Sequence, residues 1–338
     1  MKAEDFFVSR QKNKIQKKIL ENIKNISFTK IEDYPFVSII FPNWNGKNDT
    51  IECLTSLAKL DYPKSKMEII ITDNGSEDGS LEAIEKKFSE IENEGWYKLK
   101  LIENKENRGA PAAYNQCLKE INKDYNYAWK LDNDVILNPK SLIGLIKVGE
   151  SMEKIGIIGG NELSYHEKNK VRTIGTLFSS LTKEYHPYVG KDYNKISYQY
   201  YNVDVTPGTS TLIKKAVIEK IGNFNEIYFV YYDDVDFCWR SKKEGFKIVG
   251  VKKSLIWHKK GGTTGDTISS FGLYYYLRNR LIFFRLNTKG INKIISILKL
   301  VFIAYFRHYL RAFYHLKFKA CGIIIKGIFS GLLTKIKK

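Results

Sequence analysis

The chain has 338 residues, and its 43% hydrophobic content is that of a globular protein with room for one large α/β domain and further segments. Its four cysteines form no Cys-x-x-Cys pair and follow no secretory signal, which argues against a zinc site and favours a reducing compartment. The net charge of +18 is uneven, because no acidic residue follows Asp266 while the last 72 residues contain 14 lysines or arginines. We therefore expect an acidic partner for this region, either a membrane surface or a nucleic acid.

Residues 1–34 predict a charged helical lead-in, after which strand and helix patterns alternate. Short apolar runs predict strands at residues 36–42, 67–72, 98–102 and 125–131. Amphipathic patterns predict a helix that ends near residue 60 and others that begin near residues 80, 110 and 139. This alternation indicates a Rossmann-like α/β domain with a mostly parallel sheet and helices on both faces. In such sheets, ligands bind beyond the carboxyl ends of the strands.

Polar residues follow each of the four predicted strands. Asp132 and Asp134 come after the fourth strand, and two carboxylates at this spacing can share one Mg²⁺ or Mn²⁺ ion that holds a diphosphate. Asp73 ends the second strand, where it can accept a hydrogen bond from a base, and Arg108 follows the third, where it can pair with phosphate. The asparagine, glycine and serine residues around them also have ordinary roles in turns and helix caps.

The βα pattern weakens beyond residue 151. One more strand is predicted at residues 155–159, followed by an irregular insertion of hairpins and loops at residues 165–201, a kind of segment that often covers or selects a substrate. Asp233 and Asp234 then begin a predicted helix. Acids at a helix N-terminus are favoured by the helix dipole, but one carboxylate here can also act as a general base.

His258 follows a short strand predicted at residues 254–256. A lone histidine is usually structural. The Gly- and Thr-rich stretch after it, residues 259–265, includes two lysines and suits a lid that closes on phosphates.

Taken in order, these motifs resemble those of the family 2 glycosyltransferases with the GT-A fold, especially the branch of bacterial rhamnosyltransferase-like enzymes. The resemblance covers roughly residues 36–285. The matching residues are Asn43-Trp44-Asn45-Gly46, Asp73-Asn74-Gly75-Ser76-x-Asp78-Gly79-Ser80, Asn107-Arg108-Gly109, Asp132-x-Asp134, Gly208, Tyr232-Asp233-Asp234-Val235-Asp236 and Trp257-His258-Lys259. The Gln-x-x-Arg-Trp motif of processive members is missing, so a polymerising synthase is not expected.

The resemblance implies a catalytic domain over residues 35–285, in which residues 35–140 bind a nucleotide-sugar donor and residues 141–285 bind the acceptor. It implies an inverting enzyme that uses Mg²⁺ or Mn²⁺, with Asp234 as the catalytic base. The implied donor-binding residues are Asn43, Trp44, Asn45, Asp73, Arg108 and Asp132. The implied metal contacts are Asp132, Asp134 and His258. The implied acceptor or sugar contacts are Gly208, Asp233 and Trp257.

Residues 286–338 form a basic tail that is predicted to be helical. Its apolar stretches, residues 294–306 and 320–334, are interrupted by lysine and fall short of the roughly 20 apolar residues of a spanning helix. We expect amphipathic helices that lie on an anionic membrane surface, at the cytoplasmic face. The alternative is a helical pair packed on the catalytic domain with a solvated basic face. Nucleic acid is disfavoured as a partner because the tail is too apolar.

The leading hypothesis is a peripheral membrane glycosyltransferase that moves one sugar from a nucleotide sugar to a lipid-linked saccharide acceptor in glycan biosynthesis. One alternative is a haloacid-dehalogenase-like phosphatase, whose acidic motifs Asp132-x-Asp134 and Asp233-Asp234 would imitate. That class places its first acidic pair after the first strand, whereas three βα units precede Asp132 here. Another alternative is a non-catalytic, polybasic membrane protein whose α/β domain only binds a ligand.

Overall fold

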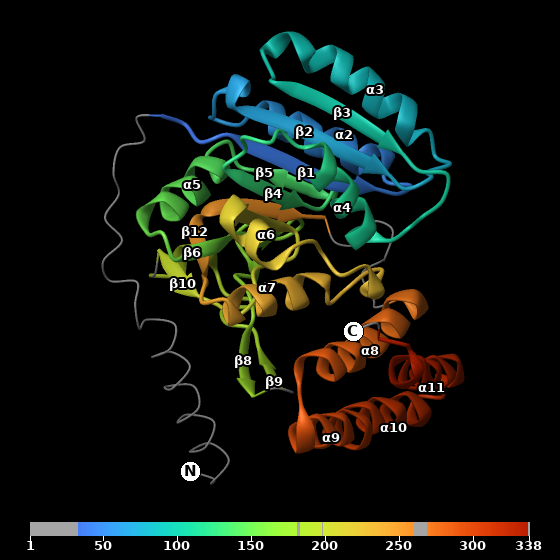
Figure 1. The fold of residues 1–338 in the computed structure, drawn as a ribbon. Helices are drawn as coiled ribbons and strands as arrows, with labels where there is room; N and C mark the ends of the chain where they lie inside the picture. The colour runs from blue at the N-terminus through green and yellow to red at the C-terminus, as the bar shows by residue number, and fades with distance from the viewer. Residues whose placement is uncertain (1–32, 181–182, 198, 260–268, 337–338) are drawn as a thin grey trace.

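The computed structural model describes residues 33–180, 183–197, 199–259 and 269–336, so the lead-in predicted for residues 1–34 lies almost wholly outside the described residues. The first half of the central sheet is the parallel sheet that the sequence predicts (Figure 1). Its strands lie in the order β3-β2-β1-β4. They span Val37–Asn43 (β1), Met67–Asp73 (β2), Lys98–Glu103 (β3) and Tyr127–Leu131 (β4).

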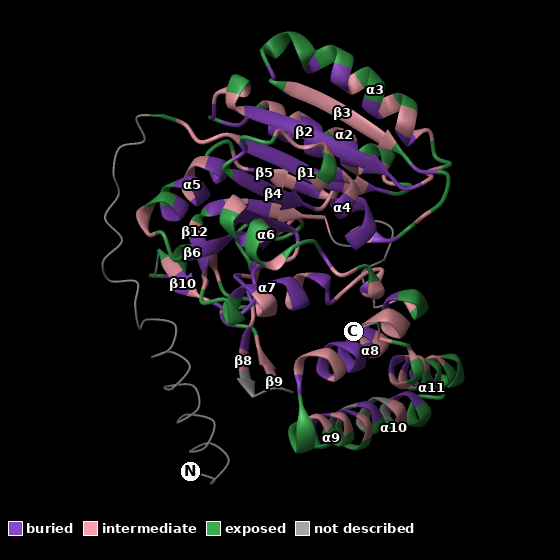
Figure 2. Ribbon diagram, viewed as in Figure 1, coloured by how far each residue is buried: buried purple, intermediate pink, exposed green. Residues whose placement is uncertain are grey.

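Helices cover both faces of this sheet (Figure 1). One hydrophobic cluster joins the sheet to α2, α3 and α5, and a second joins it to α4, α6 and α7. The helices span Lys47–Ala58 (α2), Ser80–Ile91 (α3), Ala110–Glu120 (α4), Ser141–Ser151 (α5), Lys215–Ile221 (α6) and Asp233–Lys243 (α7). Short 3₁₀ turns span Lys64–Lys66, Glu92–Glu94, Tyr193–Lys195 and Glu226–Tyr228. Figure 2 shows the inner strands buried on both faces, which explains their continuous apolar sequences.

The second half of the sheet mixes strand directions. The strand β11 (Ser210–Lys214) runs antiparallel to β4, while β6 (Ile155–Ser164) and β12 (Lys247–His258) pair in parallel. The strand predicted at residues 254–256 is present but much longer than expected, because it is part of β12, which has 12 residues and a register shift between Gly250 and Leu255. Edge strands β10 (Tyr200–Asn202) and β5 (Val135–Leu137) pair with β12. The pairing with β5 places His258 opposite Val135, next to Asp134.

The irregular insertion predicted at residues 165–201 is confirmed. It contains β7 (Val171–Thr173), which pairs with β6, and a separate antiparallel hairpin of β8 (Leu177–Ser180) and β9 (Lys183–Tyr185). Figure 1 shows this hairpin extending from the sheet toward the C-terminal helices. The salt bridge between Glu184 of β9 and Arg280 of the C-terminal layer agrees with this placement.

The C-terminal region forms a helical layer on one side of the α/β domain (Figure 1). It contains α8 (Ser270–Asn287), α9 (Gly290–Lys299), a π-helical segment (Leu300–Tyr305), α10 (Phe306–Tyr314) and α11 (Phe318–Leu333). The expected boundary between residues 285 and 286 falls within α8. Helices α8 and α11 pack closely because Gly327 and Gly331 leave room for the side chains of Leu277 and Leu281. Among the described residues, no helix is both long enough and apolar enough to cross a membrane.

Candidate active site

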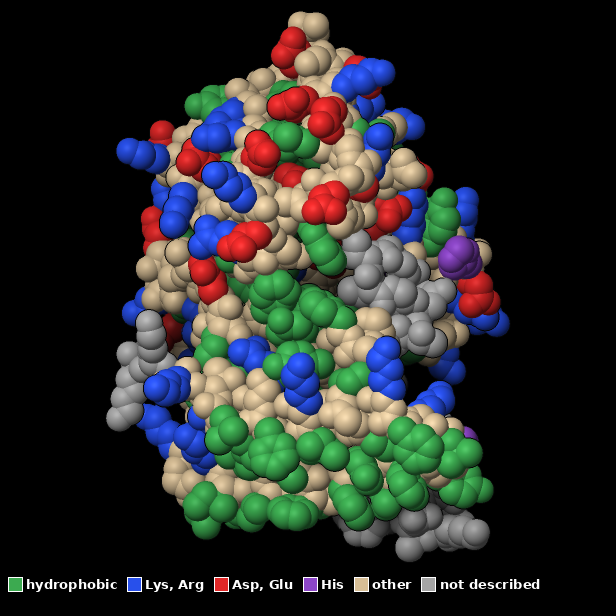
Figure 3. Space-filling view, turned by 90° about the vertical axis from the view of Figure 1, so that its right-hand side faces the viewer, with side chains coloured by type: hydrophobic (Ala, Val, Ile, Leu, Met, Phe, Trp, Pro, Cys, Tyr) green, Lys and Arg blue, Asp and Glu red, His purple; other side chains and the backbone are tan. Residues whose placement is uncertain are grey.

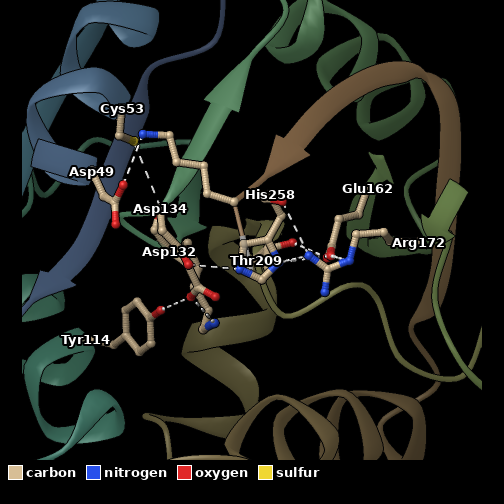
Figure 4. Close-up of polar contacts among 11 residues, drawn as sticks. Asp49, Cys53, Tyr114, Asp132, Asp134, Glu162, Arg172, Thr209 and His258 are labelled. Atoms are coloured by element: carbon tan, nitrogen blue, oxygen red, sulfur yellow. Dashed lines mark hydrogen bonds and ion pairs between the residues drawn. The ribbon is translucent and has the colours of Figure 1, made fainter. Parts of the chain in front are cut away.

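Asp132, Asp134 and His258 meet at the carboxyl end of β4 (Figure 4). Each offers one ligand atom, and the three atoms lie within 4.8 Å of one another. His258 Nε2 and Asp134 Oδ2 are 3.1 Å apart. Two carboxylates and one imidazole suit a divalent ion such as Mn²⁺. The structure thus brings together the three residues that the sequence predicts as metal contacts.

Glu162, which the sequence analysis did not predict, contacts the ring nitrogen of His258 that faces away from Asp134. Its Oε1 lies 2.9 Å from His258 Nδ1, and its Oε2 accepts a hydrogen bond from Thr209 Oγ1 at 2.8 Å. Burial alone would lower the pKa of His258, but Asp134 and Glu162 raise it to about 10. A carboxylate on the second ring nitrogen fixes the orientation of a metal-binding histidine, so this geometry fits a metal at Nε2.

Lys130 lies beneath the acidic residues and is almost completely buried. Its Nζ donates to the carbonyl oxygen of Gly208 at 2.6 Å and lies 3.9 Å from Asp132 Oδ1. Its charge lowers the pKa values of Asp132, Asp233 and Asp234, which burial raises more strongly. A lysine inside the apolar strand at residues 127–131 was a visible signal for this role, because a buried lysine requires anionic partners.

Asp233 and Asp234 begin α7 and line a cavity of about 360 Å³ together with Asp132 and His258. Burial, with repulsion from the neighbouring acids, raises the pKa of Asp233 to about 7. The pKa of Asp234 is also raised, chiefly by burial. Gly208 faces Asp234, and a Cβ on this glycine would lie 2.7 Å from Asp234 Oδ2. The predicted base, its acidic neighbour and two of the three predicted metal contacts, Asp132 and His258, therefore share one cavity.

The loop before Asp233 has an unusual backbone. Phe229, Tyr231 and Tyr232 all have positive φ angles of 61° to 71°, a conformation that is unfavourable for bulky residues. Asn279 of α8, which is fully buried, holds this loop: its Nδ2 lies 2.6 Å from the carbonyl oxygen of Tyr228 and 2.7 and 3.0 Å from those of Val230 and Tyr231. Sequence reasoning missed Asn279 because its partners lie about 50 residues away.

A second cavity, of about 380 Å³, adjoins the first, since Ala110 and Val230 line both. Asn43 and Trp44 line it at the end of β1, as expected for donor-binding residues. Further residues on its wall are Pro42, Asn74, Asn107, Gly109, Asn133, Phe229, Ser269 and Phe271.

The other predicted donor-binding residues lie behind or beside this second cavity. Asp73 is buried, and its carboxylate accepts hydrogen bonds from Asn43 Nδ2 at 2.6 Å and from Ser76. Asn45 stabilises the same turn, because its Oδ1 accepts from the backbone N–H of Glu77. Arg108 is exposed on the rim and is not among the lining residues that the structure describes. Asp73 and Asn45 therefore shape the wall through other residues.

The remaining predicted contacts are placed as follows. Gly208 and Asp233 line the first cavity, whereas Trp257 packs against the core and donates its indole N–H to the carbonyl of Lys168. Lys259, the first residue of the predicted phosphate lid, forms salt bridges with Asp49 and Glu52 (Figure 4 shows Asp49). Most of that lid, residues 260–268, lies outside the described residues.

Solved structures with the same fold bind nucleotide sugars. The mannosyltransferase PcManGT from Pyrobaculum calidifontis, solved with GDP-Man and Mn²⁺, matches 98% of this chain and 95% of its own, with a TM-score of 0.62 and 14% identity. S. aureus TarS 1–349, solved with UDP-GlcNAc, matches 87% of this chain and 81% of its own, with a TM-score of 0.57 and 16% identity. At these identities, the likeness establishes the GT-A fold of the chain.

Sequence relatives point to the same family. The galactofuranosyltransferase GlfT2 of Mycobacterium tuberculosis is 23% identical over 54% of this chain and 31% of its own length. The poly-beta-1,6-N-acetyl-D-glucosamine synthase of Staphylococcus aureus strain MSSA476 is 27% identical over 63% of this chain and 47% of its own length. The chain thus spans less than half the length of these curated relatives. The family model for glycosyl transferase family 2 matches residues 38–222, more than half of the chain, and the chain therefore belongs to this family.

Proposed function

We propose that the chain is an inverting, metal-dependent glycosyltransferase that moves one sugar from a nucleotide sugar to a lipid-linked saccharide acceptor. The observation that carries this proposal is the shared cavity, which Asp132, His258 and Asp234 all line, with Asp134 next to it at 3.1 Å from His258 Nε2. The family assignment argues against the phosphatase alternative. The membership in a rhamnosyltransferase-like branch stays a prediction.

The donor would occupy both cavities. The nucleoside fits the second cavity, where Asn43, Asn74 and Asn107 offer amide groups to a base or ribose and Trp44 and Phe229 offer aromatic faces. The diphosphate would then lie at Asp132, Asp134 and His258. A bound divalent ion there supplies positive charge that stabilises the leaving diphosphate. The two solved neighbours bind a guanine and a uracil nucleotide sugar, so the proposal does not specify the nucleobase of the donor.

Asp234 would accept the proton of the attacking acceptor hydroxyl. Its raised pKa makes it a stronger base than an exposed aspartate, while Lys130 limits the shift and keeps an ionised form accessible. Asp233 shares the site, and its pKa near 7 leaves it partly protonated at neutral pH. Attack by the hydroxyl in a single displacement inverts the anomeric centre. The chain lacks the processive motif, so we propose transfer of one sugar per acceptor.

The helical layer supports a peripheral membrane location. Helices α9 to α11 and the π-helical segment expose many large apolar side chains, among them Phe302 (67% exposed), Tyr314 (83%) and Leu333 (75%). Figure 3 shows hydrophobic side chains gathered over the C-terminal layer, with lysines and arginines beside them. An apolar face with cations at its edge fits an anionic lipid surface. The inner face of the layer packs on the α/β domain through α8, as expected if these helices pack on that domain. The two expectations for this region therefore apply to its two faces.

The test is a panel of nucleotide sugars with Mg²⁺ or Mn²⁺, read by release of nucleoside diphosphate. We expect release from at least one donor, and loss of at least a hundredfold in the Asp234→Asn variant. The wild-type protein should also float with anionic vesicles. No release from any donor, or full activity of Asp234→Asn, would refute the enzymatic proposal.

A further inference from the structure

The first cavity has more lining residues than the proposed donor and the proposed catalytic base, Asp234, would use. A second group of lining residues, here called the hairpin side, comes from the β8/β9 hairpin and the residue before it, from the loop before α7 and from α8. The residues that line this side are Thr176, Phe178, Glu184, Tyr231, Tyr232 and Tyr276. Four of these six side chains are aromatic and one is a carboxylate.

Glu184 is held at this wall by three neighbours. Tyr232 donates its hydroxyl to Glu184 Oε1 at 3.0 Å, and Arg280 Nη2 lies 3.7 Å from the same oxygen. Among the residues that the structure describes, the nearest partner of Oε2 is His186, whose Nε2 is 3.7 Å away. Oε2 therefore keeps capacity to accept a hydrogen bond from a ligand in the cavity.

The charge of Glu184 persists inside the protein. Burial alone would raise the pKa of its carboxyl group, but contact with His186 and the charge of Arg280 lower it below its ordinary value. Glu184 and Asp234 both line this cavity. Among the described lining residues, this side of the cavity contributes one negative charge and no lysine or arginine.

This chemistry selects a class of ligand. An ionised carboxylate without a lining cation repels phosphate, whereas it accepts hydrogen bonds from neutral hydroxyl groups. Aromatic faces bury the apolar C–H side of a sugar ring. We propose that Glu184, Phe178 and Tyr276 form the acceptor subsite, which binds the terminal uncharged sugar of the acceptor and presents its hydroxyl to Asp234.

The placement of this subsite agrees with an acceptor that enters from the helical layer. Tyr276 and Arg280 belong to α8, and the opposite side of α8 packs against α11. The sugar would lie between the hairpin and α8, while the phosphate and lipid portions extend toward α9 to α11. This inference rests on the proposed glycosyl transfer and adds where the acceptor sugar binds.

The experiment separates donor chemistry from acceptor binding. A panel of neutral octyl hexopyranosides serves as acceptor probes, with octyl glucuronide as the anionic comparison. Nucleoside diphosphate release is measured first without acceptor, as slow hydrolysis, and then with increasing glycoside. The variants are Glu184→Gln, which keeps the shape of the side chain, and Phe178→Ala, which leaves the contacts of Arg280 in place. Glu150→Gln is the matched control, because Glu150 also accepts a hydrogen bond from a tyrosine, Tyr127, outside the lining of this cavity.

We expect at least one neutral glycoside to accelerate release by the wild-type protein, and octyl glucuronide to be weaker. Glu184→Gln and Phe178→Ala should each raise the KM for that glycoside at least tenfold, with hydrolysis in the absence of acceptor within twofold of wild type. Glu150→Gln should change neither value. Unchanged KM in both variants, an equal loss of hydrolysis and transfer, or no acceleration by any glycoside would overturn the subsite. Absence of release from every donor would instead overturn the glycosyl transfer itself.

Discussion

Gly208 and Asp234 lie so close that a single methyl group on Gly208 would stand 2.7 Å from Asp234 Oδ2. Gly208, two residues before β11, therefore sets the position of the proposed base. The carbonyl oxygen of Gly208 also accepts the hydrogen bond of Lys130. The backbone at Gly208 therefore positions both the Lys130 ammonium and the Asp234 carboxylate.

We expect Gly208→Ala to displace Asp234 and reduce kcat by roughly a hundredfold, a loss typical of an ångström-scale misplacement of a reacting group. The dissociation constant of the nucleoside diphosphate should stay within about threefold of wild type, because the second cavity does not include Gly208. Steady-state kinetics and calorimetry measure the two quantities. Gly322→Ala is the control, since a Cβ there meets open space. A normal kcat in Gly208→Ala would contradict the argument.

The loop that carries Asp233 and Asp234 depends on Asn279. We expect Asn279→Ala to lower the free energy of unfolding by about 2 kcal/mol, because it leaves buried carbonyl groups without a partner. It should also lower kcat at least tenfold, since positive φ angles persist only where surrounding contacts enforce them. Denaturant unfolding and kinetics provide the readouts. Asn287→Ala, on the same helix and partly exposed, should affect both far less.

The raised pKa of Asp233 predicts that the stability of the protein depends on pH. Its pKa is raised from 3.8 to about 7 in the folded protein, so the folded state binds more protons than the unfolded state between these values. The free energy of unfolding should therefore fall as pH rises through this window. In EDTA, Asp233→Asn should be more stable than wild type at pH 8, by up to about 4 kcal/mol, and nearly equal to it near pH 4.

Denaturant titrations at several pH values measure this difference between Asp233→Asn and wild type. The exposed Asp124 provides the control, because Asp124→Asn should follow wild type throughout. A stability gain that does not depend on pH would show that the aspartate is destabilising for a reason other than its proton.

Metal binding should also depend on pH. Without a metal, His258 has a pKa of about 10 and is protonated at neutral pH, so an ion that binds Nε2 must displace this proton. We expect the affinity for Mn²⁺ to weaken by up to about tenfold for each pH unit between 8 and 6. Calorimetry in buffers of different ionisation enthalpy should record proton release. His258→Ala should bind more weakly and lose most of this dependence, while His166→Ala, at an exposed site, should match wild type.

The exposed side chains of the helical layer predict how the protein binds vesicles. Burial of one phenylalanine side chain in lipid stabilises binding by about 2 kcal/mol, so replacing both Phe302 and Phe313 by serine should weaken vesicle binding at least a hundredfold. Flotation with anionic and neutral vesicles measures this loss. Transfer to a water-soluble octyl glycoside should be unaffected. Tyr97→Ser, which removes an exposed aromatic residue from the catalytic domain, should float like wild type.

The parts of the fold and site that local sequence reveals were predicted well. Strands β1, β2 and β4 are largely apolar runs, and Asn43 at the end of β1 and Asp132 after β4 line the cavities as expected. The length of β12 was missed because Lys252 and Lys253 interrupt its apolar pattern where the register shifts.

Other site residues depend on contacts between distant segments. Glu162 reaches His258 only through the parallel pairing of β6 with β12, and Glu184 reaches the cavity only through the fold of the hairpin. Asn279 lies in a stretch that looks like any other part of a helix until α8 is placed beside the loop of Tyr231. No spacing within a single segment records such neighbours. Asp73 lies at the expected strand end, but its carboxylate accepts hydrogen bonds from Asn43 and Ser76 and does not line the second cavity.

The position of Asn279 on α8 has a consequence for how the chain can be divided. One side of this helix holds the backbone that leads to Asp234, and its other side receives Gly327 and Gly331 of α11. The helical layer therefore supports the loop that leads to the proposed base, and a chain shortened before residue 288 would lose part of this support. Substitutions on the outer helices must keep α8 in place, so the sequence of the helical layer and that of the α/β domain constrain each other.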